Sequence, residues 1–179
     1  MNILPNYLTC IKLHFQHHSP PQVIDHVILT TQTALTVTKE LKALFPTIDC
    51  QLVLAGAMLH DIGRSKTHYI DHGIIGGEIL RQHGFPIELI HIVENHIFAG
   101  VLKNEASEFG LPAQDYLPKT IEEKIVAYSD NISKNIEIMS QEEVLKHFSK
   151  YLNINHPVIK RIKELHEEIE AYLKKARSG

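Results

Sequence analysis

The stretch that decides the fold reads Gln51-Leu52-Val53-Leu54-Ala55-Gly56-Ala57-Met58-Leu59-His60-Asp61-Ile62-Gly63. Its apolar run has no polar face, which predicts a helix over 51–60 that is buried on all sides. Burying His60 and Asp61 at the end of this helix costs free energy unless both side chains are paired. A divalent cation pairs with both, because imidazole offers a neutral nitrogen and carboxylate offers hard oxygens. The dipeptide therefore indicates a metal site whose other ligands must come from elsewhere in the chain.

The remaining sequence is also patterned as helices, and no alternation of apolar and polar residues is long enough to predict a sheet. Helix start and stop signals predict an all-α fold of about seven or eight helices. They are expected over residues 5–17, 23–44, 51–60, 72–83, 86–97, 120–139 and 140–152, with a last amphipathic helix starting near residue 156. Residues 100–118 are expected to form a loop with one helical turn.

Three polar residues are expected to start helices in this pattern. Asp71 can cap the helix over 72–83. Thr120 and Ser140 are each followed three residues later by a glutamate, which is the spacing of a capping box.

The bulk composition limits the functions open to the chain. A length of 179 residues predicts a single domain over 1–179. The net charge of −3 gives no basic excess, so no binding of a nucleic-acid polymer is expected. No apolar stretch reaches the about 18–20 residues of a membrane span, so we expect no membrane association and a cytoplasmic location.

Further candidate ligands are spread over the predicted helices, each within or beside apolar sequence. Any one of them alone is more often a packed or surface residue than a ligand. The ordered set is more informative, because every member is of a metal-ligating type. It consists of His26, His60, Asp61, His72, His96 and Asp130.

The stretch His60-Asp61-Ile62-Gly63 carries a specific resemblance. With His26 placed 34 residues upstream and Asp130 placed 70 residues downstream of His60, it resembles the HDIG subgroup of the HD-domain metal-dependent phosphohydrolase superfamily. The resemblance covers about residues 20–135 and implies an HD-domain helical bundle over that metal-binding core. Residues 140–179 would then form additional C-terminal helices.

The resemblance also implies a ligand set. His26, His60, Asp61 and Asp130 would bind one metal ion. In members with two ions, histidines at the places of His72 and His96 join in and the aspartate at the place of Asp61 bridges the ions. Many such members carry two adjacent histidines at the later place, whereas Ile97 follows His96 here. Two ions are favoured and one stays open, as does their identity among Mn, Fe, Mg, Zn, Co and Ni.

The implied activity is hydrolysis of a phosphomonoester or phosphodiester, of a nucleotide or related metabolite, by a metal-activated water. Asp61, Arg64 and Lys66 are the candidate catalytic residues, since Arg64 and Lys66 can contact phosphate oxygens just after the ligand pair. His68 and Asn131 are candidate substrate contacts beside them. Some mononuclear HD nucleotidases place a water-orienting glutamate where this chain has Arg64, so that mechanism is not supported.

Two other functions fit the same ligand types. Some HD-domain proteins with four histidines and two aspartates hold two irons and act as oxygenases on small organic substrates, which here would be anionic. A non-catalytic helical domain that keeps the metal for structure or for binding a partner is the third interpretation. The amphipathic last helix could pack within the chain or join two copies in a homo-oligomer.

Overall fold

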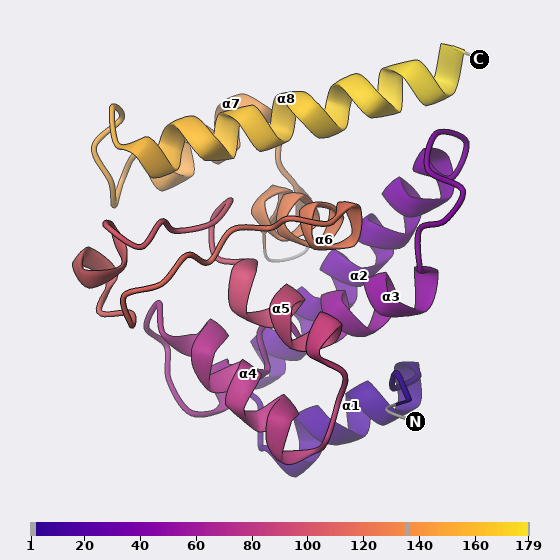
Figure 1. Ribbon diagram of the computed structural model, residues 1–179, viewed down its shortest axis with the longest axis vertical. Coiled ribbons are helices and arrows are strands. Elements are labelled where there is room, and N and C mark those ends of the chain that lie inside the picture. The colour runs from indigo at the N-terminus through magenta and orange to yellow at the C-terminus, as the bar shows by residue number, and fades with distance from the viewer. Residues whose placement is uncertain (1–2, 135–136, 179) are drawn as a thin grey trace.

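A computed structural model describes residues 3–134 and 137–178 of the chain (Figure 1). These ranges form a helical bundle, which confirms the all-α prediction. The helices are α1 (Tyr7–Gln16), α2 (Pro21–Leu41), α3 (Cys50–Leu59), α4 (His72–Gln82), α5 (Ile87–Asn95), α6 (Ile121–Ile132), α7 (Gln141–Phe148) and α8 (Pro157–Ser178). Two 3₁₀ turns, η1 (Ile62–Ser65) and η2 (Ala106–Phe109), interrupt the connections.

Helix α3 is the centre of the bundle, as its apolar sequence predicts. The Asp49 side chain caps it by accepting hydrogen bonds from the backbone N–H groups of Gln51 and Leu52. Met58 and Leu59 are fully buried, and α3 packs against α1, α2, α5 and α6. The helix ends just before His60 and Asp61, so the two polar side chains enter the middle of the molecule.

Two apolar clusters lie on either side of α3. One joins α3 to α1, α4 and α5. The other joins α3 to α2, α6 and α8, and α8 runs along the top of the bundle in Figure 1. The apolar face of α8 is buried within the chain through Ile162 and Ile169. Among the helices of the described ranges, none combines the length and apolar character needed to cross a membrane.

Glycines let η1, α4 and α5 approach one another closely. A Cβ atom built on Gly63 would lie 1.9 Å from the backbone oxygen of His72 and 2.7 Å from the backbone nitrogen of Gly76. A Cβ on Gly77 would lie 2.4 Å from Glu94 Oε1. The glycine of the His60–Gly63 stretch is therefore required by the contact between η1 and the first turns of α4.

The predicted helix over 120–139 is too long. Helix α6 ends at Ile132, because Ser133 adopts extended torsion angles (φ −87°, ψ 119°). Strands β1 (Ser133–Lys134) and β2 (Glu137–Ile138) then pair antiparallel, with Ser133 opposite Ile138. Serine and asparagine favour helix interiors weakly, which lets this short hairpin replace the last turns. The expectation of no sheet is corrected accordingly.

The predicted caps fare differently. Ser140 forms a complete capping box with Glu143 at the start of α7. Thr120 accepts from the backbone of Glu123, but the Glu123 carboxylate accepts from Asn95 and from the backbone of Lys119 instead of closing a box. Asp71 has helical torsion angles and accepts from the Thr67 hydroxyl, so the prediction that its side chain caps α4 is wrong.

Candidate metal centre

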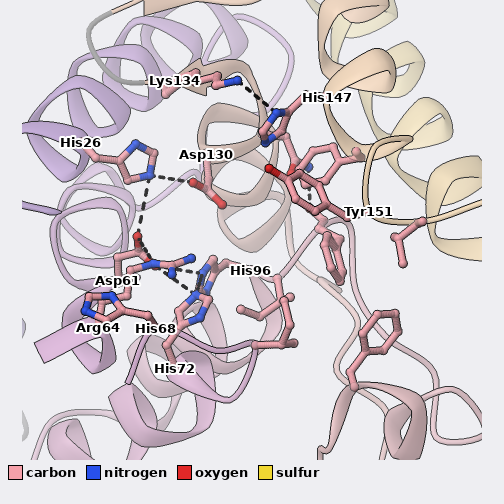
Figure 2. A pocket seen from close by; sticks show the side chains of 18 of the residues that line it. His26, Asp61, Arg64, His68, His72, His96, Asp130, Lys134, His147 and Tyr151 are labelled. Atoms are coloured by element: carbon pink, nitrogen blue, oxygen red, sulfur yellow. Dashed lines mark hydrogen bonds and ion pairs between the residues drawn. The ribbon is translucent and has the colours of Figure 1, made fainter. Parts of the chain in front are cut away.

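The structure brings the six predicted ligands to one place, from five helices. His26 comes from α2, Asp130 from α6, and His72 from the start of α4. His60 and Asp61 follow α3, and His96 follows α5. Five of them line a cavity of about 640 Å³ (Figure 2). His60 does not line it and is fully buried.

The histidines are held in a defined orientation by their own backbone. Nδ1 of His60 lies 2.8 Å from the Ala57 carbonyl oxygen, and Nδ1 of His96 lies 2.8 Å from that of Val93. The same contact joins Nδ1 of His72 to the Tyr69 carbonyl oxygen at 2.6 Å. A carbonyl only accepts, so each Nδ1 carries the hydrogen and each neutral ring keeps a lone pair on Nε2. This is the tautomer that a metal ligand needs.

The Nε2 atoms of the four histidines face one another in pairs. The distance is 3.3 Å between His26 and His60, and 3.2 Å between His72 and His96. The lone pairs of His72 and His96 repel each other unless a proton or a cation lies between them, and His26 Nε2 also lies 2.9 Å from the acceptor Asp130 Oδ1. The arrangement therefore provides two places for a positive charge.

Asp61 lies between the two pairs. Its Oδ1 is 3.0 Å from His72 Nε2 and 3.7 Å from His96 Nε2. Its Oδ2 is 3.9 Å from the Nε2 atoms of both His26 and His60. Oδ1 is buried and has no hydrogen-bond donor despite its proximity to His72. An orphaned carboxylate oxygen beside two imidazole lone pairs is a donor set suited to a divalent cation.

Asp130 completes the side nearer α2 and α6. Its Oδ1 lies 2.9 Å from His26 Nε2 and 3.3 Å from His60 Nε2. His26, His60 and Asp130 thus form one group of potential ligands, and His60, Asp61 and His96 form another.

The electrostatics show that this site requires positive charge. Burial lowers the pKa of His60, but the charges of Asp130 and Asp61 outweigh burial and raise that pKa to about 9. Burial raises the pKa of Asp61, but the surrounding imidazoles of His60, His72 and His96 hold it well below its usual range. Without a metal, a proton on His60 balances the carboxylates. A bound cation would take over that role and release the proton.

The predicted substrate contacts are only partly brought together. Arg64 lines the cavity and donates from Nε to Asp61 Oδ2 at 2.7 Å. His68 and Asn131 also line it, and Asn131 donates to the backbone oxygen of Phe98. Lys66 is exposed and does not line the cavity. It lies near His17, whose pKa is lowered by burial first, then by His83, and then by the charge of Lys66. Its position gives no support to a catalytic role.

Glu94 is buried, although it precedes His96 by only two residues. It pairs with Arg81 on α4 at 2.7 Å and does not line the cavity. Among the described lining residues, the carboxylates are Asp61 and Asp130 alone. The other lining groups able to transfer a proton include imidazoles, a lysine ammonium and a tyrosine phenol.

The sequence reasoning missed the far wall of the cavity. Lys134 from β1, His147 and Phe148 from α7, and Tyr151 after α7 all line it. The available signal was that Lys134 follows Asp130 by four residues, close enough to lie at the same opening.

Comparison with known proteins assigns a family to this arrangement. The sequence profile described as "HD domain" matches residues 23–135. An uncharacterised protein of Methanocaldococcus jannaschii is 48% identical over 85% of this chain and 90% of its own length. A tRNA (cytidine(56)-2'-O)-methyltransferase of Picrophilus torridus is 40% identical over 94% of this chain, which spans about half (47%) of that protein.

Two further proteins are more distant. Ribonuclease Y of Acidothermus cellulolyticus is 31% identical over 68% of this chain and 21% of its own length. Among solved structures, the HD domain of the phosphodiesterase PgpH from L. monocytogenes, in complex with cyclic-di-AMP, superposes with a TM-score of 0.52. The superposition covers 93% of this chain and 95% of that domain. The sequences are 17% identical, so this likeness shows the fold alone.

Proposed function

The chain belongs to the HD domain family, and from this premise we propose that it is a metal-dependent phosphoric ester hydrolase. The observation that carries the proposal is the geometry of Asp61. One of its oxygens faces the His72–His96 pair, and the other faces the His26–His60 pair. A carboxylate can ligate one ion through each oxygen, which favours two ions over one.

The six residues divide naturally between two ions. His26, His60 and Asp130 would hold one, His72 and His96 the other, with Asp61 shared. Two bound divalent ions would bind phosphate oxygens, make a water nucleophilic at neutral pH and stabilise the leaving oxygen. The absence of a second histidine at Ile97 costs the second ion one ligand, and an open position of this kind suits a catalytic rather than a structural site.

The chain's own groups position the substrate. Arg64 lies at the edge of the metal ligands, where its guanidinium can contact phosphate oxygens while its Nε stays on Asp61. His68 and Asn131 line the neighbouring wall and would contact the groups attached to the phosphate. In the reaction a bond forms between phosphorus and a water oxygen, the bond to the leaving oxygen breaks, and the water's proton ends on the leaving group.

The names of the relatives agree in part with this chemistry. Ribonuclease Y is by name a nuclease, and nucleases cleave phosphodiesters. The methyltransferase is named for a different reaction, in a protein about twice as long as the matched region. We therefore propose hydrolysis, and not methyl transfer, as the function of this chain.

Hydrolysis of bis(p-nitrophenyl) phosphate and p-nitrophenyl phosphate, with Mn, Mg, Co, Ni or Fe(II), tests the proposal. We expect turnover with at least one ion and two bound ions per chain. His72→Ala should remove one ion and lower the rate by at least about 10- to 100-fold. Loss of a group that only hydrogen-bonds to a metal ligand typically has an effect of that size. His91→Ala is the matched control, because His91 is exposed and outside the cavity.

Two results would contradict the proposal. One is the absence of turnover on both esters together with tightly held iron that gives a mixed-valence spin signal, which would favour the oxygenase. The other is equal metal content and rate in His72→Ala and His91→Ala.

A further inference from the structure

The cavity extends well beyond the metal ligands. Its volume of about 640 Å³ lies within the about 300–1,000 Å³ typical of sites for whole small molecules. A single phosphate group between the ligands leaves most of this space unfilled. The lining residues beyond the ligands therefore indicate what else the substrate carries.

One cation stands at the far end. Figure 2 shows Lys134 and His147 next to each other, on the opposite side of the cavity from His72, with Asp130 between the two sides. Lys134 Nζ lies 3.0 Å from His147 Nδ1, and no described carboxylate forms an ion pair with this lysine. Burial, with Lys134 and Lys150 nearby, lowers the pKa of His147, so the neutral ring accepts from the ammonium. The ammonium keeps two further hydrogens for a ligand.

The surroundings of this pair are more positive than negative. A second hollow of about 370 Å³ shares Lys134, Met139 and His147 with the main cavity and adds Lys146, Lys150, Glu137 and Glu143. The Glu143 carboxylate is already engaged by Ser140 in the capping box of α7. Three lysines face two carboxylates here, one of them committed, so an anion is favoured at this end.

The wall between the two ends is apolar and aromatic. The Phe98 ring lies 5.4 Å from Phe109 and 5.6 Å from Phe148, measured between ring centroids. Tyr151 is 75% exposed although it lines the cavity. The three phenylalanine rings are half-buried, so the exposed Tyr151 ring is the better stacking surface for a planar ligand group such as a nucleobase.

We propose that Lys134, held by His147, binds a second phosphate of the substrate, so that the site takes nucleotides with at least two phosphates. One phosphate would lie at the metal ligands, a nucleoside along the aromatic wall, and the next phosphate on the Lys134 ammonium. The inference rests on the hydrolase proposed above and adds its substrate class. Linear dinucleotides with a terminal phosphate and cyclic dinucleotides both carry two phosphates separated by a nucleoside, and the test separates them.

The test compares the dinucleotide ApA with its 5′-phosphorylated form, which differs by one phosphate, on the full chain with the activating metal. We expect a kcat/KM higher for the phosphorylated form by roughly 10- to 100-fold, the worth of one charge-assisted hydrogen bond. Lys134→Gln should reduce this ratio to near one and Lys134→Arg should retain it. Cyclic di-AMP is the third substrate tested. If the site prefers cyclic dinucleotides, Lys134→Gln should lower kcat/KM on cyclic di-AMP alone.

The failures of the two proposals can be told apart. Lys39→Gln is the control, because Lys39 is exposed on α2 and outside the cavity. Lys39→Gln should keep the wild-type ratio and hydrolyse bis(p-nitrophenyl) phosphate as the wild type does. A wild-type ratio near one with both substrates hydrolysed overturns the second-phosphate site and leaves the hydrolase intact. Without any hydrolysis, calorimetric binding of the same two dinucleotides decides the question: equal affinities in wild type and Lys134→Gln overturn it.

Discussion

Gly63→Ala tests why a glycine stands two residues after the His60–Asp61 pair. The added Cβ would lie 1.9 Å from the His72 carbonyl oxygen, about 1.5 Å inside the 3.4 Å at which ordinary contact begins. The obstacle is backbone, so no side-chain rotation relieves it and η1 must move away from α4. That movement separates Asp61, which precedes η1, from His72, which starts α4. The substitution thus acts on the two ligands whose atoms are 3.0 Å apart.

The expected effects follow from this overlap. Overpacking costs typically about 1–3 kcal/mol, and an immovable backbone contact places this case near 3 kcal/mol. For a chain of this size that lowers Tm by about 6–12 °C. A shift of about 1 Å between ligands lowers the rate about 100-fold. Thermal unfolding by circular dichroism and turnover of bis(p-nitrophenyl) phosphate measure the two effects.

Gly84→Ala supplies the matched control. Gly84 has φ +70° and nothing within 4 Å of a built Cβ, so the same substitution adds backbone strain without overlap. It should lower Tm slightly and leave turnover and metal content unchanged. If Gly63→Ala matches Gly84→Ala in turnover and metal content, the reasoning about the η1–α4 contact is refuted.

Three further predictions concern the ligands and their supports. Asp61→Asn should abolish binding of at least one ion and lower turnover by more than tenfold, since a neutral amide bridges cations poorly; metal analysis that finds two ions would contradict this. Chelation should lower the free energy of unfolding by about 2.7 kcal/mol, the amount lost when a ligand at 100 times its Kd is removed, and should lower Tm with it. The double variant His17→Ala/His83→Ala, which removes an exposed histidine pair, should respond equally. His14 is buried, and its Nε2 lies against the Met58 carbonyl oxygen. Burial lowers its pKa, so its contribution to stability is present above pH 6.5 and is lost as pH falls. In denaturant unfolding, His14→Gln should have a free energy of unfolding about 1–3 kcal/mol below the wild type at pH 7.5, and the difference should narrow toward pH 5.

The sequence predicted the parts of the fold that depend on local pattern. The apolar run before His60 could only be a buried helix, and that placement fixed where the ligand pair would lie. The convergence of six ligands came from the family resemblance, since spacing alone does not determine which helix faces meet. The sequence does not predict the orientation of the histidines, because it depends on backbone carbonyl oxygens three residues earlier, two of them in helices and one in the loop before α4.

The structure places Arg64 and Lys66 differently. Arg64 and Lys66 follow the ligands in one short stretch and were expected to act together. Residues two positions apart on a helical turn point in different directions, so η1 directs Arg64 into the cavity and leaves Lys66 on the surface near His17. The wall formed by Lys134 and His147 was missed for the opposite reason. It depends on a hairpin and on the docking of α7, which bring together residues that no periodic pattern connects.

This division between local and non-local parts has a consequence for how the site can vary. The predicted metal ligands lie on or just after α2 to α6. Of these helices, α2, α5 and α6 pack against α3 and α4 packs against α5 and η1, so a change there should alter metal binding and stability together. The far wall is built from the hairpin, α7 and the residue Tyr151, which contribute few groups to the core. Substitutions in that wall can therefore change which phosphate-bearing ligand fits while the metal ligands keep their positions. Under the proposed function, the chemistry would depend on the helices that carry the predicted metal ligands, and the choice of substrate would depend on the hairpin and α7.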